Sequence, residues 1–318
     1  MTRLARVAAL AAACALGPAA LAAAQPAVDP HPGLLARARA YVGAYAESFA
    51  NLISEERAEQ ELRSTPPLRS TPRSMAGSGP APVVAQPPDT VQRRRLTANY
   101  IVVRAETGLG WLPFRDVYEV DGRPVPDRPK RLTALLSGKG PVDIATARKL
   151  VAEGTRHDLG NLDRSLNVPV FGLIFLHPQL TFQSTFAFVA DEAVGDRPAA
   201  VYRFQEVGKP ALVTGPGGSN LVSAGRVWLD LASGAVLRTE HKVTANDVDA
   251  TITVAFTGDA RLGMAVPDHM DEEYRWTSRR DILRVTARYS NYRKLDVTTT
   301  EDTPLPGQKK PPGGRHYH

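Results

Sequence analysis

The sequence predicts an α+β protein in which a large, curved antiparallel sheet is only partly covered by helices. From Leu180 onward, short runs of alternating apolar and polar residues recur between Gly-containing turns, which is typical of antiparallel strands. Residues 33–62 carry apolar side chains at helical spacing, and residues 127–159 contain two further helical stretches. Too few helices precede the strands to cover one whole face of the sheet.

The first 25 residues are expected to be a signal peptide, so we expect the mature protein in the periplasm. Arg3 and Arg6 precede an apolar stretch, and small residues run to Ala24, which fits cleavage near that residue. The single cysteine, Cys14, follows a leucine by four residues rather than three, so we do not expect a lipoprotein modified at Cys14. The mature chain then has no thiol, which excludes disulfides and Cys-based catalytic or metal sites.

Residues 26–62 are expected to form an N-terminal helix that packs on the main domain. Pro32 stands just before the helical pattern, where proline is tolerated. The apolar face recurs at spacings of three and four and comprises Leu34, Leu35, Ala38, Tyr41, Val42, Tyr45, Phe49, Leu52 and Ile53. Because helices that lie on membranes are richer in basic residues, packing on the sheet is favoured.

Residues 63–92 are expected to be a disordered, proline-rich insertion. Seven prolines lie between Pro66 and Pro88, a composition that cannot build a core. We favour a spacer over a segment that docks a partner. The main domain then spans residues 93–303, and the tail 304–318, rich in Pro, Gly and Lys, is expected to be disordered.

The main domain is expected to begin with two strands, 96–103 and 111–120, that end in the turn Asp121-Gly122. A short helix around Leu132 and a second helix capped by Asp143 follow. The later strands are expected at 181–190, 199–208, 210–214, 225–231, 235–245, 250–258, 266–276 and 282–295.

The clearest hairpin runs from Gly225 to Glu240 across a turn that contains Gly234. Simple alternation places Val227 and Leu229 on one face and Trp228 on the other. Which of these faces is concave stays open at this point. The apolar segment 168–176 is either plain core or the lining of a cavity.

No local motif predicts an enzyme, a metal site or a cofactor. The Gly-rich residues 215–218 lack the pattern of a phosphate loop, and the histidines lack metal-ligand spacing. The acidic cluster around Asp271 and Glu273 is interpreted as a solvated sheet face paired with arginines of the next strand. Without residues 1–25 the formal net charge falls from +6 to +4, and no aromatic and basic platform indicates nucleic-acid binding.

The order of these elements resembles the LolA/LolB-like superfamily of periplasmic lipoprotein carriers. The resemblance rests on the signal peptide with its following helix, the helical insertion 127–159, and the hairpin pattern of Trp228, Asp230 and Gly234. It implies an open half-barrel whose concave face is covered by the N-terminal and inserted helices. The proline-rich insertion and segment 168–176 depart from the pattern, so the chain is more similar to other exported proteins of this architecture than to the lipoprotein chaperones.

Three functions follow as hypotheses. The first is a non-enzymatic carrier or sensor that binds a lipid, an acyl chain or the anchor of a lipidated protein as a monomer. Its candidate ligand-binding residues are Phe171, Ile174, Phe175, Phe186, Phe204, Trp228 and Phe256. The second is a cell-envelope scaffold module with a filled core and a protein partner, and the third is a hydrolase without a recognisable motif.

Overall fold

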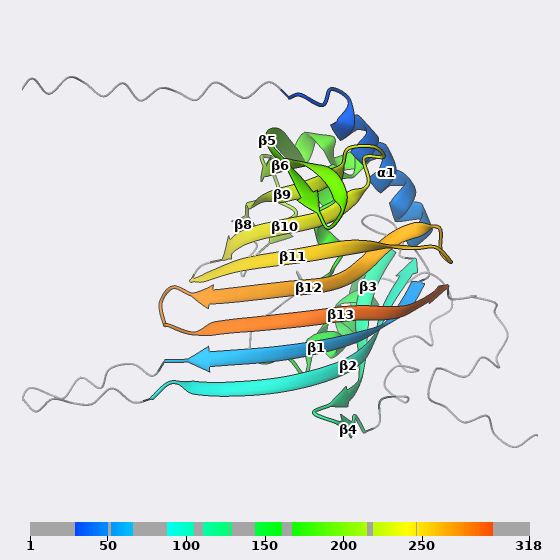
Figure 1. The fold of residues 1–318 in the computed structure, drawn as a ribbon. Coiled ribbons are helices and arrows are strands. Elements are labelled where there is room, and N and C mark those ends of the chain that lie inside the picture. Colours follow the sequence, from blue (N-terminus) through cyan, green and yellow to red (C-terminus); the bar gives the residue numbers. More distant parts are fainter. Residues whose placement is uncertain are drawn as a thin grey trace, which may run out of the picture.

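The computed structural model describes residues 29–49, 52–65, 88–104, 111–126, 128, 144–160, 167–214, 219–245 and 247–294 (Figure 1). The predictions that lie outside these residues concern the signal segment with Ala24 and Cys14, most of the proline-rich insertion, the short helix around Leu132, the cap Asp143 and the tail 304–318. Within the described ranges, no helix combines the length and the hydropathy needed to cross a membrane.

Eleven of the described strands form one large antiparallel sheet that curves without closing, which confirms the predicted fold class (Figure 1). The strands of this sheet are β1 (Leu52–Ser64), β2 (Thr90–Arg104), β3 (Trp111–Val120), β4 (Arg123–Pro124), β5 (Ser184–Val194), β6 (Arg197–Glu206), β9 (Ser223–Asp230), β10 (Val236–Ala245), β11 (Val248–Asp259), β12 (Met264–Trp276) and β13 (Ile282–Lys294). Their order is β4-β3-β2-β1-β13-β12-β11-β10-β9-β6-β5, so the two outermost strands do not pair with each other. The short strands β7 (Val213–Thr214) and β8 (Asn220–Leu221) pair separately.

The helical elements cover the concave face, which we call the inner face. They are α1 (Leu34–Phe49), α3 (Ile144–Thr155) and the 3-10 helices η1 (Phe171–Leu176) and η2 (Pro178–Gln183). Buried side chains of α1 and η1 join those of the strands in one hydrophobic core, and α3 packs on β3. The helical insertion is thus confirmed over α3, and the later part of the apolar segment 168–176 forms the buried helix η1.

The N-terminal helix is shorter than predicted, and the helix expected over residues 52–62 is wrong. α1 ends at Phe49, and these residues form β1, which lies between β2 and β13 in the sheet. Alternate residues of β1 are buried on the inner face, namely Glu56, Ala58, Gln60 and Leu62. Because two of these four are polar, the period-two pattern is hard to recognise in the sequence. Residues 63–64 and 90–92 also belong to strands rather than to the insertion.

The hairpin predicted between Gly225 and Glu240 is confirmed as β9–β10. Val227 pairs with Thr239, and Gly234 in the turn has φ 75°, a conformation that favours glycine. A Cβ added at Gly234 would lie 2.8 Å from the Cβ of Arg37 on α1. The turn therefore needs glycine both for its own geometry and for the close approach of α1.

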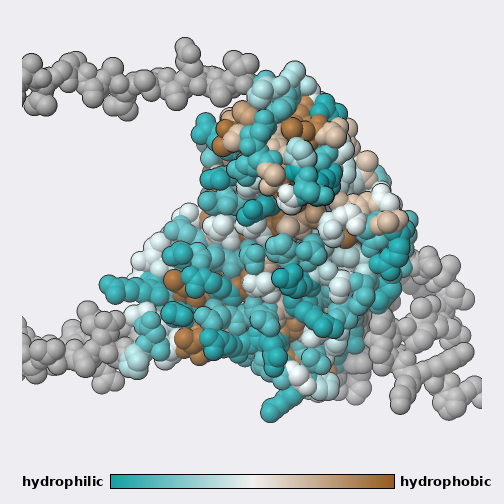
Figure 2. Space-filling model, in the orientation of Figure 1, coloured by the Kyte–Doolittle hydropathy of each residue, from teal (hydrophilic) through white to brown (hydrophobic). Residues whose placement is uncertain are grey.

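The opposite, outer face is mainly hydrophilic over β1 and β11 to β13 (Figure 2). The interpretation of the acidic residues on β12 as a paired sheet face is confirmed for Glu273, which forms ion pairs with Arg284 at 2.9 Å and Arg275 at 2.5 Å. Asp271 accepts a hydrogen bond from Thr286 at 2.9 Å. Such exposed pairs contribute little to stability, about 0–1 kcal/mol each.

Candidate functional site

The inner face of β5, β6, β9 and β10 carries a row of residues in cross-strand register. Phe186 pairs with Phe204, Phe204 with Gly225, and Gly225 with His241. Registered neighbours point to the same face, so the three side chains converge over Gly225. A Cβ added at Gly225 would lie 2.7 Å from the Phe204 ring. Glycine is therefore needed at this position, because a larger residue would clash with the ring.

The helix η1 adds two rings to this row. The ring of Phe175 stacks on Phe204 with 4.5 Å between centroids, and the ring of Phe171 lies 5.1 Å from that of His241. Phe186 lies 6.0 Å from Phe204. We call Phe171, Phe175, Phe186, Phe204 and His241 the aromatic cluster. Four of the predicted ligand-binding residues are thus brought together.

The other three predicted residues lie around or away from this cluster. Ile174 on η1 and Phe256 on β11 are partly buried against the same hydrophobic core. Trp228 belongs to a separate group on the outer face with Ala199, Val201 and Leu237, whereas Val227 and Leu229 lie in the inner core. The indole Nε1 of Trp228 donates to Glu192 at 2.7 Å. The face that the sequence left open is therefore settled, and Trp228 lies outside the aromatic cluster.

The aromatic cluster is closely packed. Phe175 is fully buried, and Phe204 is 2% exposed. A Cβ added at Gly172 in η1 would lie 2.9 Å from the Cβ of Thr239 on β10, so η1 rests directly on the strand below it. An apolar ligand can reach the rings of Phe175 and Phe204 only when η1 moves or a side chain rotates away.

His241 is the one titratable group of the aromatic cluster. Its ring is 3% exposed, and burial lowers its pKa to about 4. At neutral pH the imidazole is therefore uncharged. The pKa shift results from loss of water around the ring, so His241 behaves as one more flat side chain in an apolar environment.

Acidification is expected to destabilise the wild-type protein by about 3 kcal/mol more than a His241→Phe variant. The unfolded chain binds a proton at His241 near pH 6.5, whereas the folded protein binds it only near pH 4. The stability that depends on a neutral His241 is fully present above pH 6.5 and is lost as the pH falls toward 4. Urea unfolding of both proteins at pH 7 and pH 4 measures it, and parallel pH dependence of the two would contradict it.

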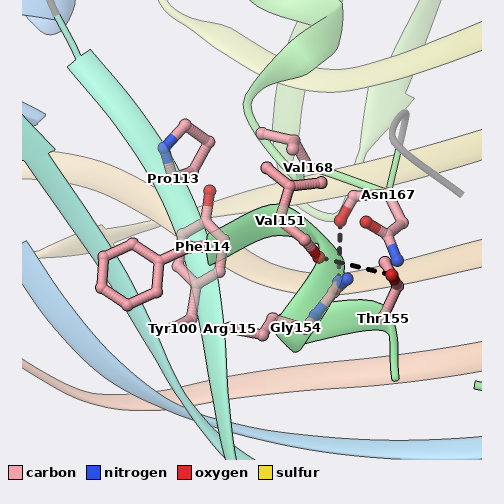
Figure 3. Close-up of a pocket in the computed structure, with 9 residues that line it drawn as sticks. All are labelled: Tyr100, Pro113, Phe114, Arg115, Val151, Gly154, Thr155, Asn167 and Val168. Carbon is pink, nitrogen blue, oxygen red and sulfur yellow. Dashed lines mark hydrogen bonds between the residues drawn. The ribbon is translucent and has the colours of Figure 1, made fainter. Parts of the chain in front are cut away.

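A second feature of the inner face is a buried ion pair below α3. Arg115 on β3 donates from Nε to the two carboxylate oxygens of Glu56 at 2.7 and 2.6 Å. Its Nη2 donates to the backbone oxygen of Asn167 at 2.7 Å (Figure 3). Arg115 is 9% exposed and Glu56 2%. The glycine at 154 allows α3 to pack here, since an added Cβ would lie 3.1 Å from the Arg115 oxygen.

Buried hydroxyl and amide groups without a hydrogen-bond partner surround this ion pair. We call them, with Glu56 and Arg115, the polar cluster. Its unpartnered atoms are Oη of Tyr45, Tyr100 and Tyr289 and Nδ2 of Asn167. Tyr100 pairs in register with Ser54 and with Arg115, and its ring lies 5.6 Å from that of Tyr289. A cavity of about 30 Å³ lies between Tyr100, Arg115, Asn167 and α3 (Figure 3).

Burial controls the ionisation of the polar cluster. It raises the pKa of Glu56, and the nearby charges of Glu272 and Asp158 raise this pKa further. Arg115 lowers the pKa of Glu56 and so offsets only part of the increase. Burial also raises the pKa of Tyr45, Tyr100 and Tyr289 well above the usual value. All three tyrosines are therefore neutral hydroxyls that can donate a hydrogen bond at physiological pH.

The sequence did not predict the polar cluster. Its members come from α1, β1, β2, β3, β13 and residue 167, and no two of them form a local motif. The one available signal was the alternation Glu56, Ala58, Gln60 and Leu62, which is typical of a strand with one buried face.

Two further findings concern other possible binding sites among the described residues. A groove of about 660 Å³ is lined by charged and polar side chains, including Arg93, Arg95, Glu59 and Asp121, rather than by apolar ones. Within the described ranges, no group of three His, Cys, Asp or Glu side chains lies close enough to hold a metal ion.

No protein-family model and no curated protein matches this sequence. Solved structures similar to the chain include a DUF1329 family protein from Desulfovibrio piger ATCC 29098, at 12% identity and a TM-score of 0.33, with 86% of this chain and 96% of that chain covered. They also include a domain from Vibrio parahaemolyticus that carries the provisional name outer membrane lipoprotein-sorting protein, at 11% identity and a TM-score of 0.30, with 82% and 94% covered. Similarities this low transfer no residue role, and the resemblance to the lipoprotein-carrier superfamily stays a prediction.

Proposed function

We propose that this protein is a non-enzymatic periplasmic carrier or sensor that holds the apolar part of a ligand on the inner face of its open sheet. The ligand class is a lipid, an acyl chain or the anchor of a lipidated protein. The observation that carries the proposal is the cover of the aromatic cluster: a short 3-10 helix, η1, rather than a strand of the sheet, lies over Phe204 and His241.

Moving η1 costs less than opening the sheet. The 3-10 turns of η1 are held by i→i+3 bonds, such as Leu173 N to Val170 O at 3.1 Å, whose geometry is poorer than that of an α-helix. Since η1 is not a strand of the sheet, its displacement leaves the β6–β9–β10 ladder intact. The rings below would then face the space that η1 vacates.

The energetic balance favours a long apolar ligand. Exposing a buried Phe side chain costs about 1.5–3 kcal/mol, and each buried methylene of a ligand contributes about 0.8 kcal/mol. Displacing η1 exposes Leu173 and Leu176 besides Phe171 and Phe175, so an acyl chain of about 8–15 methylenes is needed to offset it. His241, neutral and surrounded by rings, supports apolar binding rather than acid–base chemistry at this site.

A disulfide between η1 and β10 is expected to block binding. The variant Gly172→Cys/Thr239→Cys places two thiols where the Cβ atoms lie 2.9 Å apart, and a small shift reaches the roughly 3.5–4.5 Å of a disulfide. We expect the oxidised variant to bind the apolar fluorescent probe N-phenyl-1-naphthylamine at least about tenfold more weakly than the reduced variant, a difference of about 1.4 kcal/mol.

The reduced double variant and the two single variants serve as controls for the substitutions themselves. Equal binding by the oxidised and reduced forms would contradict displacement of η1. Failure of wild-type protein to bind any apolar probe would contradict the proposed function.

The close packing of the aromatic cluster favours a second candidate, a cell-envelope scaffold module with a filled core. Phe175 is fully buried and stacked on Phe204, as in an ordinary core. The same probe experiment separates the two functions, because a scaffold would exclude the probe in both redox states of the variant.

A further inference from the structure

We infer that the ligand of this protein is an amphiphile with an uncharged, carbonyl-bearing polar end, an ester or an amide, and that the polar cluster binds that end. This inference rests on the proposed function and names the class of ligand within it. Three observations lead to it: the polar cluster shares one hydrophobic core with the aromatic cluster, it has surplus hydrogen-bond donors, and its charges disfavour an acidic group.

The two clusters are connected by one segment of chain. Asn167 and Val168 line the cavity beside Arg115, and Phe171 and Phe175, a few residues later, belong to the aromatic cluster. On α1, Tyr45 of the polar cluster stacks on Phe49 at 4.9 Å, in the same hydrophobic core as Phe175. Tyr100 and Tyr289 belong to that core as well, so a long ligand that enters the core can contact both clusters.

The unpartnered groups of the polar cluster can all donate hydrogen bonds. The hydroxyls of Tyr45, Tyr100 and Tyr289 and the amide of Asn167 belong to residues that are 2–5% exposed. A buried donor without an acceptor destabilises the folded protein, so native proteins rarely retain several together. A carbonyl oxygen accepts two hydrogen bonds and would satisfy two of these donors at once.

The charges around the ion pair decide between an uncharged and an acidic end. Arg115 is already bound by Glu56, and the acids Glu272 and Asp158 also raise the pKa of Glu56. A carboxylate or phosphate placed here would have to compete with Glu56 for Arg115, and Glu272 and Asp158 would oppose it. An ammonium group would fit this balance of charge, but it brings no acceptor for the unpartnered donors.

The size of the cavity also favours a carbonyl group over a phosphate. Its volume of about 30 Å³ corresponds to one or two water-sized groups. A carbonyl oxygen is of that size, whereas a phosphate with its oxygens is larger. The cavity therefore accepts a carbonyl without movement of α3.

Competition against N-phenyl-1-naphthylamine with three compounds of equal chain length tests the inference. We expect methyl decanoate to displace the probe from wild-type protein at a concentration about tenfold lower than decanoate or decylamine, which corresponds to about 1.4 kcal/mol. The double variant Tyr100→Phe/Tyr289→Phe should lose this preference, so that the three compounds displace the probe from it at similar concentrations. Tyr118→Phe is the matched control, because Tyr118 lies near Glu55 and Arg57 of the outer face.

The outcomes separate this inference from the proposed function. If the probe binds and the three compounds compete equally, or if the tyrosine variants keep the ester preference, then only waters satisfy the polar cluster and the inference is wrong while the proposed function stands. Tightest binding of decanoate or decylamine also overturns it. If no apolar compound binds at all, the proposed function fails first.

Discussion

Replacing Arg115 with methionine is expected to lower the free energy of unfolding by about 3–5 kcal/mol, because it leaves the carboxylate of Glu56 buried without its partner. The loss should shrink as the pH falls, since burial raises the pKa of Glu56 and protonation then removes the uncompensated charge. Urea unfolding monitored by circular dichroism measures both effects.

Two further variants make this result interpretable. Glu56→Gln combined with Arg115→Met should recover much of the lost stability, because no charge is then buried alone. Arg93→Met removes the exposed ion pair with Glu61, at 2.8 Å, and should cost less than about 1 kcal/mol. A loss for Arg115→Met no larger than that for Arg93→Met would show that the Glu56 site is open to water.

Replacing Phe175 with alanine is expected to lower the free energy of unfolding by about 3–5 kcal/mol and to strengthen binding of an apolar probe. Phe175 is fully buried and stacks on Phe204, so its removal leaves a cavity lined by Phe204, Phe171 and His241. An apolar compound that fills this cavity should restore part of the lost stability.

The matched control for this variant is Phe182→Ala in the adjacent helix η2. Phe182 is 68% exposed, so its replacement should change stability by no more than about 0.5 kcal/mol. Thermal unfolding of both variants with and without the probe gives the comparison. A small loss for Phe175→Ala, with no effect of the probe, would mean that the aromatic cluster is neither packed nor a binding site.

The sheet could be predicted from the sequence wherever one face of a strand is apolar. β9, β10 and β11 show regular alternation that ends at glycine-containing turns, and their observed bounds lie within a few residues of the predicted ones. The aromatic cluster could be predicted in part for the same reason. Phe186 and Phe204 sit on inner faces of strands, and Phe171 and Phe175 lie in one conspicuously apolar segment.

The strand β1 and the polar cluster could not be predicted in this way. The inner face of β1 is half polar, and Glu56 is tolerated there only because Arg115, distant in the sequence, reaches it across β2. The apolar face of α1 also continues into Leu52 and Ile53 at helical spacing, although both are buried in β1. Local periodicity cannot distinguish these cases, because the compensating contact is tertiary.

The side of the sheet on which Trp228 lies also could not be predicted from local periodicity. Alternation assigns Trp228 and Val227 to opposite faces but does not say which face is covered. The covering elements decide it: α1 and η1 pack on the side of Val227, and Trp228 is shielded on the other side by Arg238, whose guanidinium lies 4.7 Å from the ring centroid.

Native mass spectrometry of the protein isolated from its own host, without detergent, tests the central claim most directly. We expect the mass of the mature chain plus one lipid-sized molecule, which fragmentation identifies as an ester or an amide and which apolar probes displace. A mass equal to that of the chain alone, together with no binding of apolar probes by the wild-type protein, would contradict the claim that the inner face holds a hydrophobic ligand.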